Sequence, residues 1–241
     1  MKCIAHRGYS IDRIDNSIDA IQEAVHRSYD GVEIDVQLCA SGEIVLFHDV
    51  YVGEQFISDL CLNELKQLGI CSLEDVYDQI PNISQTLLLL DIKGANFKIA
   101  SALVNFYKTR PTRNVIFCSF NRKLIHNLPM EFQKGSTFET TFVNDEYDML
   151  TRGLTAVVLH WTCLDHHFIS YCKMKDIKVY TYRHKEDKEL EYVLSITELP
   201  KVDIKSLENI KFDQYLVKID ESETDKRIKD IAKNQPSFRD V

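Results

Sequence analysis

Short apolar runs rich in Val, Ile, Leu and Phe alternate with stretches of helical periodicity along most of the chain. This alternation is typical of a parallel sheet built from βα units, and no internal repeat or low-complexity block interrupts it. The expected strands are Lys2–His6, Gly31–Leu38, Ile44–His48, Thr86–Ile92, Val115–Phe120, Ser136–Thr140, Ala156–Trp161, Lys178–Tyr182 and Phe212–Ile219, the last chosen over Lys201–Lys205 because its apolar run is longer. The expected helices are Ser17–Ser28, Leu62–Leu68, Ser72–Ile80, Phe97–Lys108, Arg122–Asn127, Asp145–Thr151, Asp165–Lys175 and Lys185–Leu194.

The length of 241 residues suits one large α/β unit. Closure of eight such strands would give a single-domain (β/α)8 TIM barrel, in which the active site lies at the carboxyl ends of the strands. We therefore predict a barrel over residues 1–220, followed by a C-terminal helix and tail over residues 221–241.

Composition and charge exclude several classes of protein. Apolar residues make up 44% and charged residues 27%, which is ordinary for a globular protein and excludes disordered and collagen-like chains. The formal net charge of −8 disfavours a nucleic acid partner. No apolar run approaches the roughly 20 residues of a membrane span, so we expect no transmembrane segment.

The seven cysteines are odd in number and form neither CxxC pairs nor the Cys/His spacing of a zinc site. Reduced, mostly buried thiols are expected. A candidate active-site histidine is already the sixth residue, which leaves no room for a cleavable signal sequence before it. The sequence therefore predicts a cytoplasmic protein.

Four of the strand-like segments carry titratable groups at or near their ends, in IAHRG, VEIDV, IVLFHD and LLLLDIKG. In VEIDV the period of two places Glu33 and Asp35 on one face of a strand that is buried on both faces. Two adjacent buried carboxylates need a cation, a proton or hydrogen-bond donors. A single metal ion would compensate the charge of both carboxylates. The structural alternative is that they cap the strand end and form salt bridges with nearby lysines.

The segment LLLLDIKG repeats this pattern, because Asp91 and Lys93 share one face after four leucines. Three carboxylates without a thiolate or paired imidazoles favour a hard ion, Mg²⁺ or Ca²⁺, over Zn²⁺. Lys93 adds a positive charge beside them. Glu139, at a later strand end, is the alternative third acid.

Two histidines on separate strands, His6 and His48, suit acid and base roles because imidazole titrates near neutral pH. The guanidinium of Arg7 matches phosphate oxygens. A metal ion, a lysine, an arginine and an acid/base pair together favour phosphoryl chemistry over carboxylate or sugar chemistry.

These residues, in this order, resemble the signature of the glycerophosphodiester phosphodiesterases, which runs His-Arg-Gly, Glu-Asn-Thr, Glu-x-Asp-Val, His-Asp and Glu-x-Lys. The resemblance covers about the first 95 residues and implies a barrel of the phospholipase C-like phosphodiesterase type. It assigns acid/base catalysis to His6 and His48, phosphate contacts to Arg7, Lys93 and Asn16, and metal ligation to Glu33, Asp35 and Asp91. Ser72-Leu-Glu-Asp-Val is similar to a family helix start and predicts a capping box.

The chain also departs from the family pattern. Asp15-Asn16-Ser17 stands for Glu-Asn-Thr, Asp91 replaces the usual glutamate, and Tyr180-Thr181-Tyr182 replaces Trp-Thr. The insertion after the His-Asp element is shortened to about Val50–Leu60, and the Asp-Gly-Ile-x-Thr-Asp of the last strand is not recognisable.

The predicted function is a metal-dependent hydrolase that cleaves glycerophosphodiesters to an alcohol and glycerol 3-phosphate by His/His acid-base catalysis. One divalent cation, Mg²⁺ or Ca²⁺, is the expected cofactor, and a small glycerophosphodiester or lysolipid is the expected partner. A first alternative is a phospholipase D-like activity on lysophospholipids or sphingomyelin, which an exposed apolar rim would favour. A second is a catalytically silent barrel that binds phosphate esters or a protein.

Several other residues are weaker candidates for the site. Phe120 and Tyr182, near strand ends, are candidates to contact the alcohol. His160 and Trp161 are candidates for the pocket mouth only, whereas His166 and His167 are expected to open an exposed helix.

Overall fold

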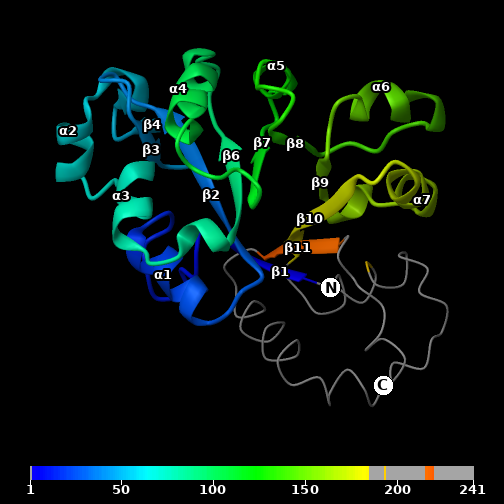
Figure 1. Cartoon of the computed structure of the whole chain (residues 1–241), viewed down its shortest axis with the longest axis horizontal. Coiled ribbons are helices and arrows are strands. Elements are labelled where there is room, and N and C mark those ends of the chain that lie inside the picture. The colour runs from blue at the N-terminus through cyan, green and yellow to red at the C-terminus, as the bar shows by residue number, and fades with distance from the viewer. Residues whose placement is uncertain (1, 185–192, 194–214, 220–241) are drawn as a thin grey trace. The chain divides into compact units, whose positions relative to one another are not determined.

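The computed structural model describes residues 2–184, 193 and 215–219 (Figure 1). The chain divides into two compact parts. The first comprises Ala5–Thr137, and the second comprises Met1–Ile4 and the chain from Phe138 onward.

A mainly parallel sheet forms the centre of the first part. Its strands are β2 (Gly31–Leu38), β3 (Ile44–Leu46), β6 (Leu87–Ile92), β7 (Val115–Cys118) and β8 (Gln133–Phe138), in the order β3-β2-β6-β7-β8, and the end of β1 (Lys2–His6) also belongs to this part. The pairs β2–β6, β6–β7 and β7–β8 are parallel, whereas β2–β3 is antiparallel. A small hairpin of β4 (Tyr51–Val52) and β5 (Gln55–Phe56) follows β3.

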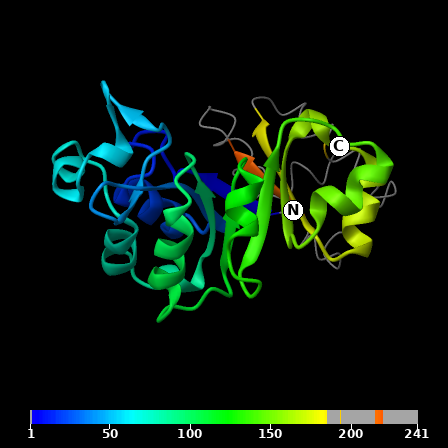
Figure 2. The ribbon, with the colours of Figure 1, turned by 90° about the horizontal axis from the view of Figure 1, so that it is seen from above.

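Helices connect these strands. They are α1 (Ile18–His26), α2 (Leu62–Gln67), α3 (Leu73–Gln79), α4 (Lys98–Tyr107) and α5 (Arg122–His126), with short 3-10 turns at Ile57–Asp59 and Ile83–Gln85. In Figures 1 and 2, α3 and α4 lie on one side of β2 and β6. The predicted capping box is confirmed, because Ser72 accepts from the backbone N–H of Asp75 and the Asp75 carboxylate accepts from that of Ser72.

Strand β2 is buried along almost its whole length, and its two faces have different chemistry. Val32, Ile34 and Val36 are fully buried, and α1 and α4 pack against this strand. Because side chains alternate along a strand, the residues between them share the opposite face. The apolar face fixes the strand in the core, and the polar face is then available for a site.

The second part repeats the same βα arrangement. It contains β9 (Ala156–His160), β10 (Lys178–His184), β11 (Tyr215–Ile219), α6 (Tyr147–Thr151) and α7 (His166–Met174), with 3-10 turns at Asn144–Glu146 and Trp161–Cys163. Strand β10 pairs in parallel with both β9 and β11. Phe168 of α7 packs edge-on against Tyr147 and Phe142, which gives this part an aromatic core.

Most expected elements are confirmed within about three residues, including the choice of a last strand that ends at Ile219. Strand β8 starts at Gln133, three residues before the predicted start at Ser136, because Gln133 and Lys134 pair with β7. The β4–β5 hairpin was not expected from the sequence. The predicted helix Lys185–Leu194 and the tail over residues 221–241 lie outside the described residues, apart from residue 193, so the predicted division at residue 220 stays a prediction.

All seven cysteines are free thiols, as expected. Burial raises the pKa of the Cys71 thiol to about 11, so this group stays protonated near neutral pH. Among the helices that the structure describes, none is long and apolar enough to cross a membrane.

A close approach between two backbone segments requires glycine at position 8. Gly8 has φ of +84°, and a Cβ there would lie 2.6 Å from the backbone carbon of Ala20 in α1. The neighbouring Tyr9 N–H donates to the Ala20 carbonyl over 2.8 Å. The chain therefore passes directly over the first turns of α1 immediately after His6 and Arg7.

We predict that Gly8→Ala lowers the free energy of unfolding by about 3 kcal/mol, because it combines left-handed strain with overpacking. Gly69→Ala is the matched control: its φ is +81°, but a Cβ there meets nothing within 4 Å. The control should lose only about 1 kcal/mol. Urea unfolding of both variants is the measurement, and equal losses would contradict the prediction.

Candidate active site

The site begins where β1 ends. Arg7 adopts a left-handed backbone conformation with φ of 57°, and its N–H donates to Glu33 Oε2 over 3.1 Å. His6 Nε2 lies 3.7 Å from the same Glu33 oxygen, and the imidazole is largely buried. Glu33 therefore fixes both the turn after β1 and the position of the first histidine.

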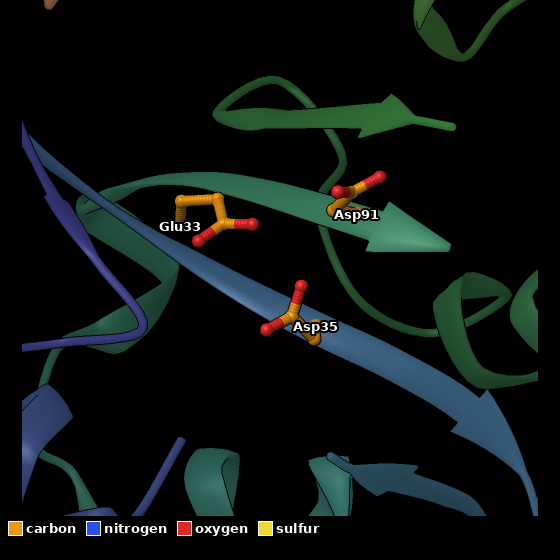
Figure 3. A group of neighbouring side chains, drawn as sticks. All are labelled: Glu33, Asp35 and Asp91. Atoms are coloured by element: carbon orange, nitrogen blue, oxygen red, sulfur yellow. The ribbon is translucent and has the colours of Figure 1, made fainter. Parts of the chain in front are cut away.

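Three carboxylates meet on strands β2 and β6 (Figure 3). Glu33, Asp35 and Asp91 are 1%, 0% and 2% exposed, and each offers an oxygen within 4.8 Å of the other two. Register explains the cluster, because β2 and β6 are parallel and Asp35 pairs directly with Asp91. Paired residues on parallel neighbours face the same side of the sheet, so the cluster follows from the strand alignment.

Two permanent cations lie among these carboxylates. Lys93 Nζ is 3.0 Å from Asp35 Oδ1 and 2.7 Å from Asp91 Oδ2, and Arg7 Nε is 3.1 Å from Asp35 Oδ2. Burial opposes the charged form of Lys93, but Asp91, Asp35 and Glu33 outweigh it and raise its pKa above the ordinary value. The pKa of Arg7 is raised in the same way against burial, with Asp35 and Asp15 as the main causes. Both side chains are therefore charged at any physiological pH.

Both the donor and the acceptor of the Asn16 side-chain amide bind Asp35. Its Nδ2 donates to Asp35 Oδ2 over 2.9 Å, and its Oδ1 accepts from the Asp35 backbone N–H over 2.9 Å. Asn16 is buried, has φ of 57° and donates its own N–H to the Arg7 carbonyl. In this structure Asn16 thus holds Asp35 and the Arg7 turn together.

The carboxylate cluster fits a hard divalent cation. Its potential ligands are all oxygens, which magnesium and calcium prefer. With Asp15, whose Oδ2 accepts from Arg7 Nη1 over 2.9 Å, four carboxylates surround the two permanent cations Arg7 and Lys93. Negative charge therefore exceeds positive charge in a largely buried site, and a bound cation would balance it.

His48 follows β3 at the edge of the sheet. Its side chain is 43% exposed, and its Nδ1 lies 2.7 Å from Asp49 Oδ1. The backbone N–H of the preceding Phe47 donates to the Asp35 carbonyl over 3.2 Å, so this segment continues the ladder beside β2. His48 therefore belongs to the same part of the chain as the other seven predicted site residues.

Of the weaker candidates, Phe120 belongs to the first part and is 50% exposed, whereas the others belong to the second part. Tyr182 donates to Glu139 Oε1 over 3.1 Å, and its ring packs edge-on against His160, all in the second part. Burial and Glu139 raise the pKa of Tyr182. His166 and His167 are exposed at the start of α7, as expected.

Two residues with a role in this geometry were not predicted from the sequence as site residues. Asp15 binds Arg7, as described above, and Gln37 contacts the backbone around His48. A signal for Gln37 was present, since it continues the period of two that starts at Glu33 and Asp35. Because the glutamine side chain is uncharged, its place in that series did not by itself indicate a catalytic or metal-binding role.

The model of the glycerophosphoryl diester phosphodiesterase family matches residues 6–233. The chain belongs to this family. The glycerophosphodiester phosphodiesterase of Caldanaerobacter subterraneus subsp. tengcongensis is 37% identical over 111 residues, which cover 42% of this chain and 46% of that protein. The chain thus spans about half the length of this curated relative.

Solved structures show the fold class. A glycerophosphodiester phosphodiesterase from Thermotoga maritima superimposes with a TM-score of 0.76 at 19% identity, covering 95% of this chain and 97% of that one. A phosphodiesterase from Oleispira antarctica, in complex with the product sn-glycerol-3-phosphate, gives 0.73 at 22% identity, covering 94% and 96%. The fold class is a (β/α)8 barrel, as predicted.

One further relative matches only a short stretch of the chain. The trigger factor of Pelagibacter ubique is 67% identical over 66 residues, which are 27% of this chain and 13% of that protein. The sequence also changes in composition after His184, because no Gly, Cys, His or Met follows this residue. All eight predicted site residues precede this change.

We predict that Asn16→Ala lowers the free energy of unfolding by about 3 kcal/mol, since two buried hydrogen bonds to Asp35 are lost together. Asn114→Ala is the matched control, because Asn114 makes one side-chain hydrogen bond, to the Ser84 carbonyl over 3.1 Å. It should lose about 1 kcal/mol. Urea unfolding without added metal tests both variants. If Asn16→Ala loses no more unfolding free energy than the control, Asn16 does not hold Asp35 in place.

Proposed function

We propose that the protein is a metal-dependent phosphodiesterase that hydrolyses a glycerophosphodiester to an alcohol and glycerol 3-phosphate. The observation that carries this proposal is the buried cluster of Glu33, Asp35 and Asp91 with His6 3.7 Å from Glu33. Family membership supports the reaction class, and the Oleispira relative in complex with sn-glycerol-3-phosphate supports the product.

In this proposal Glu33, Asp35 and Asp91 hold one divalent cation, Mg²⁺ or Ca²⁺. When bound, the ion supplies Lewis-acid polarisation of a phosphate oxygen. Lys93 and Arg7 add fixed positive charge at the phosphate. Arg7 Nη1 donates to Asp15 and Nε lies 3.1 Å from Asp35 Oδ2, so we assign the contact with the substrate to Nη2.

His6 and His48 exchange protons with the nucleophile and the leaving alcohol. The Asp49 carboxylate contacts His48 Nδ1, so Nε2 is the nitrogen that exchanges the proton, as with an orienting carboxylate in other histidine catalysts. His6 is held against Glu33, so its ring has one preferred position. The two imidazoles thus differ in exposure, one largely buried and one at the surface.

A second candidate function is phospholipase D-like cleavage of lysophospholipids. Its support is a set of exposed apolar side chains in the segments that follow the carboxyl ends of three strands of the first part: Ile14 after β1, Phe97 after β6 and Phe120 after β7. Active sites of these barrels lie at this end of the strands. Apolar groups there would contact an acyl chain.

Product analysis distinguishes the two functions. The protein is incubated with glycerophosphocholine and with lysophosphatidylcholine, each with Mg²⁺, Ca²⁺ or EDTA. Choline and glycerol 3-phosphate from the first substrate, abolished by EDTA, support the proposal. Choline and lysophosphatidic acid from the second support the alternative, and no product from either would leave a catalytically silent barrel.

We predict that His6→Ala and His48→Ala each lower turnover by about 10²-fold or more, because positioned acid/base groups contribute on that scale. His126→Ala is the control, since His126 ends the short helix α5 and has no proposed role. The assay uses a diester with a poor leaving group. Near wild-type turnover of either variant would exclude that histidine from catalysis.

A further prediction concerns Asp91, whose side chain is one methylene shorter than the glutamate usual in the family. If reach limits metal affinity, Asp91→Glu shifts the metal dependence to lower concentration, whereas Asp91→Asn weakens binding by removing a charge. Isothermal titration with Mg²⁺ and Ca²⁺ and metal titration of hydrolysis are the two measurements. Superimposable curves for wild type and Asp91→Asn would exclude Asp91 as a ligand.

A further inference from the structure

Gln37 lies on the same face of β2 as Glu33 and Asp35, two positions beyond Asp35. It is 5% exposed, and its Nε2 lies 2.7 Å from the Phe47 carbonyl oxygen and 2.6 Å from the Asp49 carbonyl oxygen. These two carbonyls stand on either side of His48. One side chain therefore spans the backbone of the proposed catalytic histidine.

Only one orientation of the Gln37 side-chain amide fits these two contacts. Both partners are carbonyl oxygens, which only accept, so the NH2 group of Gln37 must face them. An amide NH2 has two N–H donors, which matches the two acceptors. A carboxylate of the same shape would instead repel both carbonyls.

The backbone around His48 is anchored on both sides, whereas the imidazole itself is exposed. The Phe47 N–H donates to the Asp35 carbonyl, the Ile57 N–H donates to the Val50 carbonyl, and Phe47 packs against a buried apolar cluster. The imidazole is 43% exposed, and residues 47–50 lie outside the regular strands, between β3 and the β4–β5 hairpin. The His48 ring contacts its neighbour Asp49, which belongs to the same segment. The position of this exposed ring therefore depends on the backbone of residues 47–49, in which Gln37 binds the carbonyls of Phe47 and Asp49.

We infer that Gln37 is a positioning residue that holds His48 in place through the backbone on both sides of it. The inference rests on the proposed function, because it requires His48 to act in acid/base catalysis. Small displacements of a catalytic group lower turnover by up to about 10²-fold. Loss of the Gln37 amide should therefore lower kcat while substrate binding is retained.

The test is a double-mutant cycle of Gln37→Met and His48→Ala, assayed for kcat and KM at saturating metal. Met has a similar length but no donor. We expect Gln37→Met to lower kcat by about 10-fold, with KM changed by less than about twofold. In the His48→Ala background the same substitution should have no effect on kcat, because the group on which it acts is gone.

Gln133→Met is the matched control. Gln133 also donates from Nε2 to a backbone carbonyl, that of Arg113 over 2.6 Å, but it lies at the start of β8. It should leave kcat unchanged in both backgrounds. Gln37→Glu, which keeps the shape of the side chain, is the second variant and should lower kcat at least as much as Gln37→Met.

The possible outcomes separate the inference from the proposed function. If His48→Ala retains wild-type turnover, the role of His48 fails and the inference fails with it. If His48→Ala is impaired but Gln37→Met lowers kcat by the same factor in both backgrounds, only the inference about Gln37 is overturned. Unfolding of both Gln37 variants, measured by circular dichroism and urea titration, would also overturn it, because Gln37 would then be a structural residue.

Discussion

The first part of the chain depends on how the charge of Asp35 is compensated. Its carboxylate is fully buried, where an unpaired charge would be very costly. Lys93 contacts one of its oxygens, and Arg7 and Asn16 contact the other. These partners come from the turns after β1 and β6, so a single buried charge fixes the segments that surround the site.

The same arrangement explains why the site is preorganised. Glu33 accepts the Arg7 N–H and lies beside His6, while Asp91 shares Lys93 with Asp35. Each member of the network is held by at least one other member, so no large rearrangement is needed to assemble it. Preorganised charge of this kind is effective in catalysis because its orientation is established before the reaction begins.

Exposure differs sharply between the two proposed catalytic histidines. His6 is held within the buried network, whereas His48 lies on a short segment between β3 and the β4–β5 hairpin. In our proposal, the two contacts from Gln37 to the backbone on either side of His48 hold this exposed group in place.

Local sequence patterns were enough to predict the strand positions and the candidate residues, because the period of two and the βα alternation are local properties. Strand β2 was predicted to the residue, and Glu33, Asp35 and Asp91 were predicted to share a site. The partners of these residues depend on how the chain folds in three dimensions. The pairing of Asp35 with Asp91 depends on the register of two strands more than fifty residues apart, and the contacts of Asn16 and Gln37 depend on turns that approach β2 in space. Such contacts join residues distant in the chain, so no local pattern specifies them.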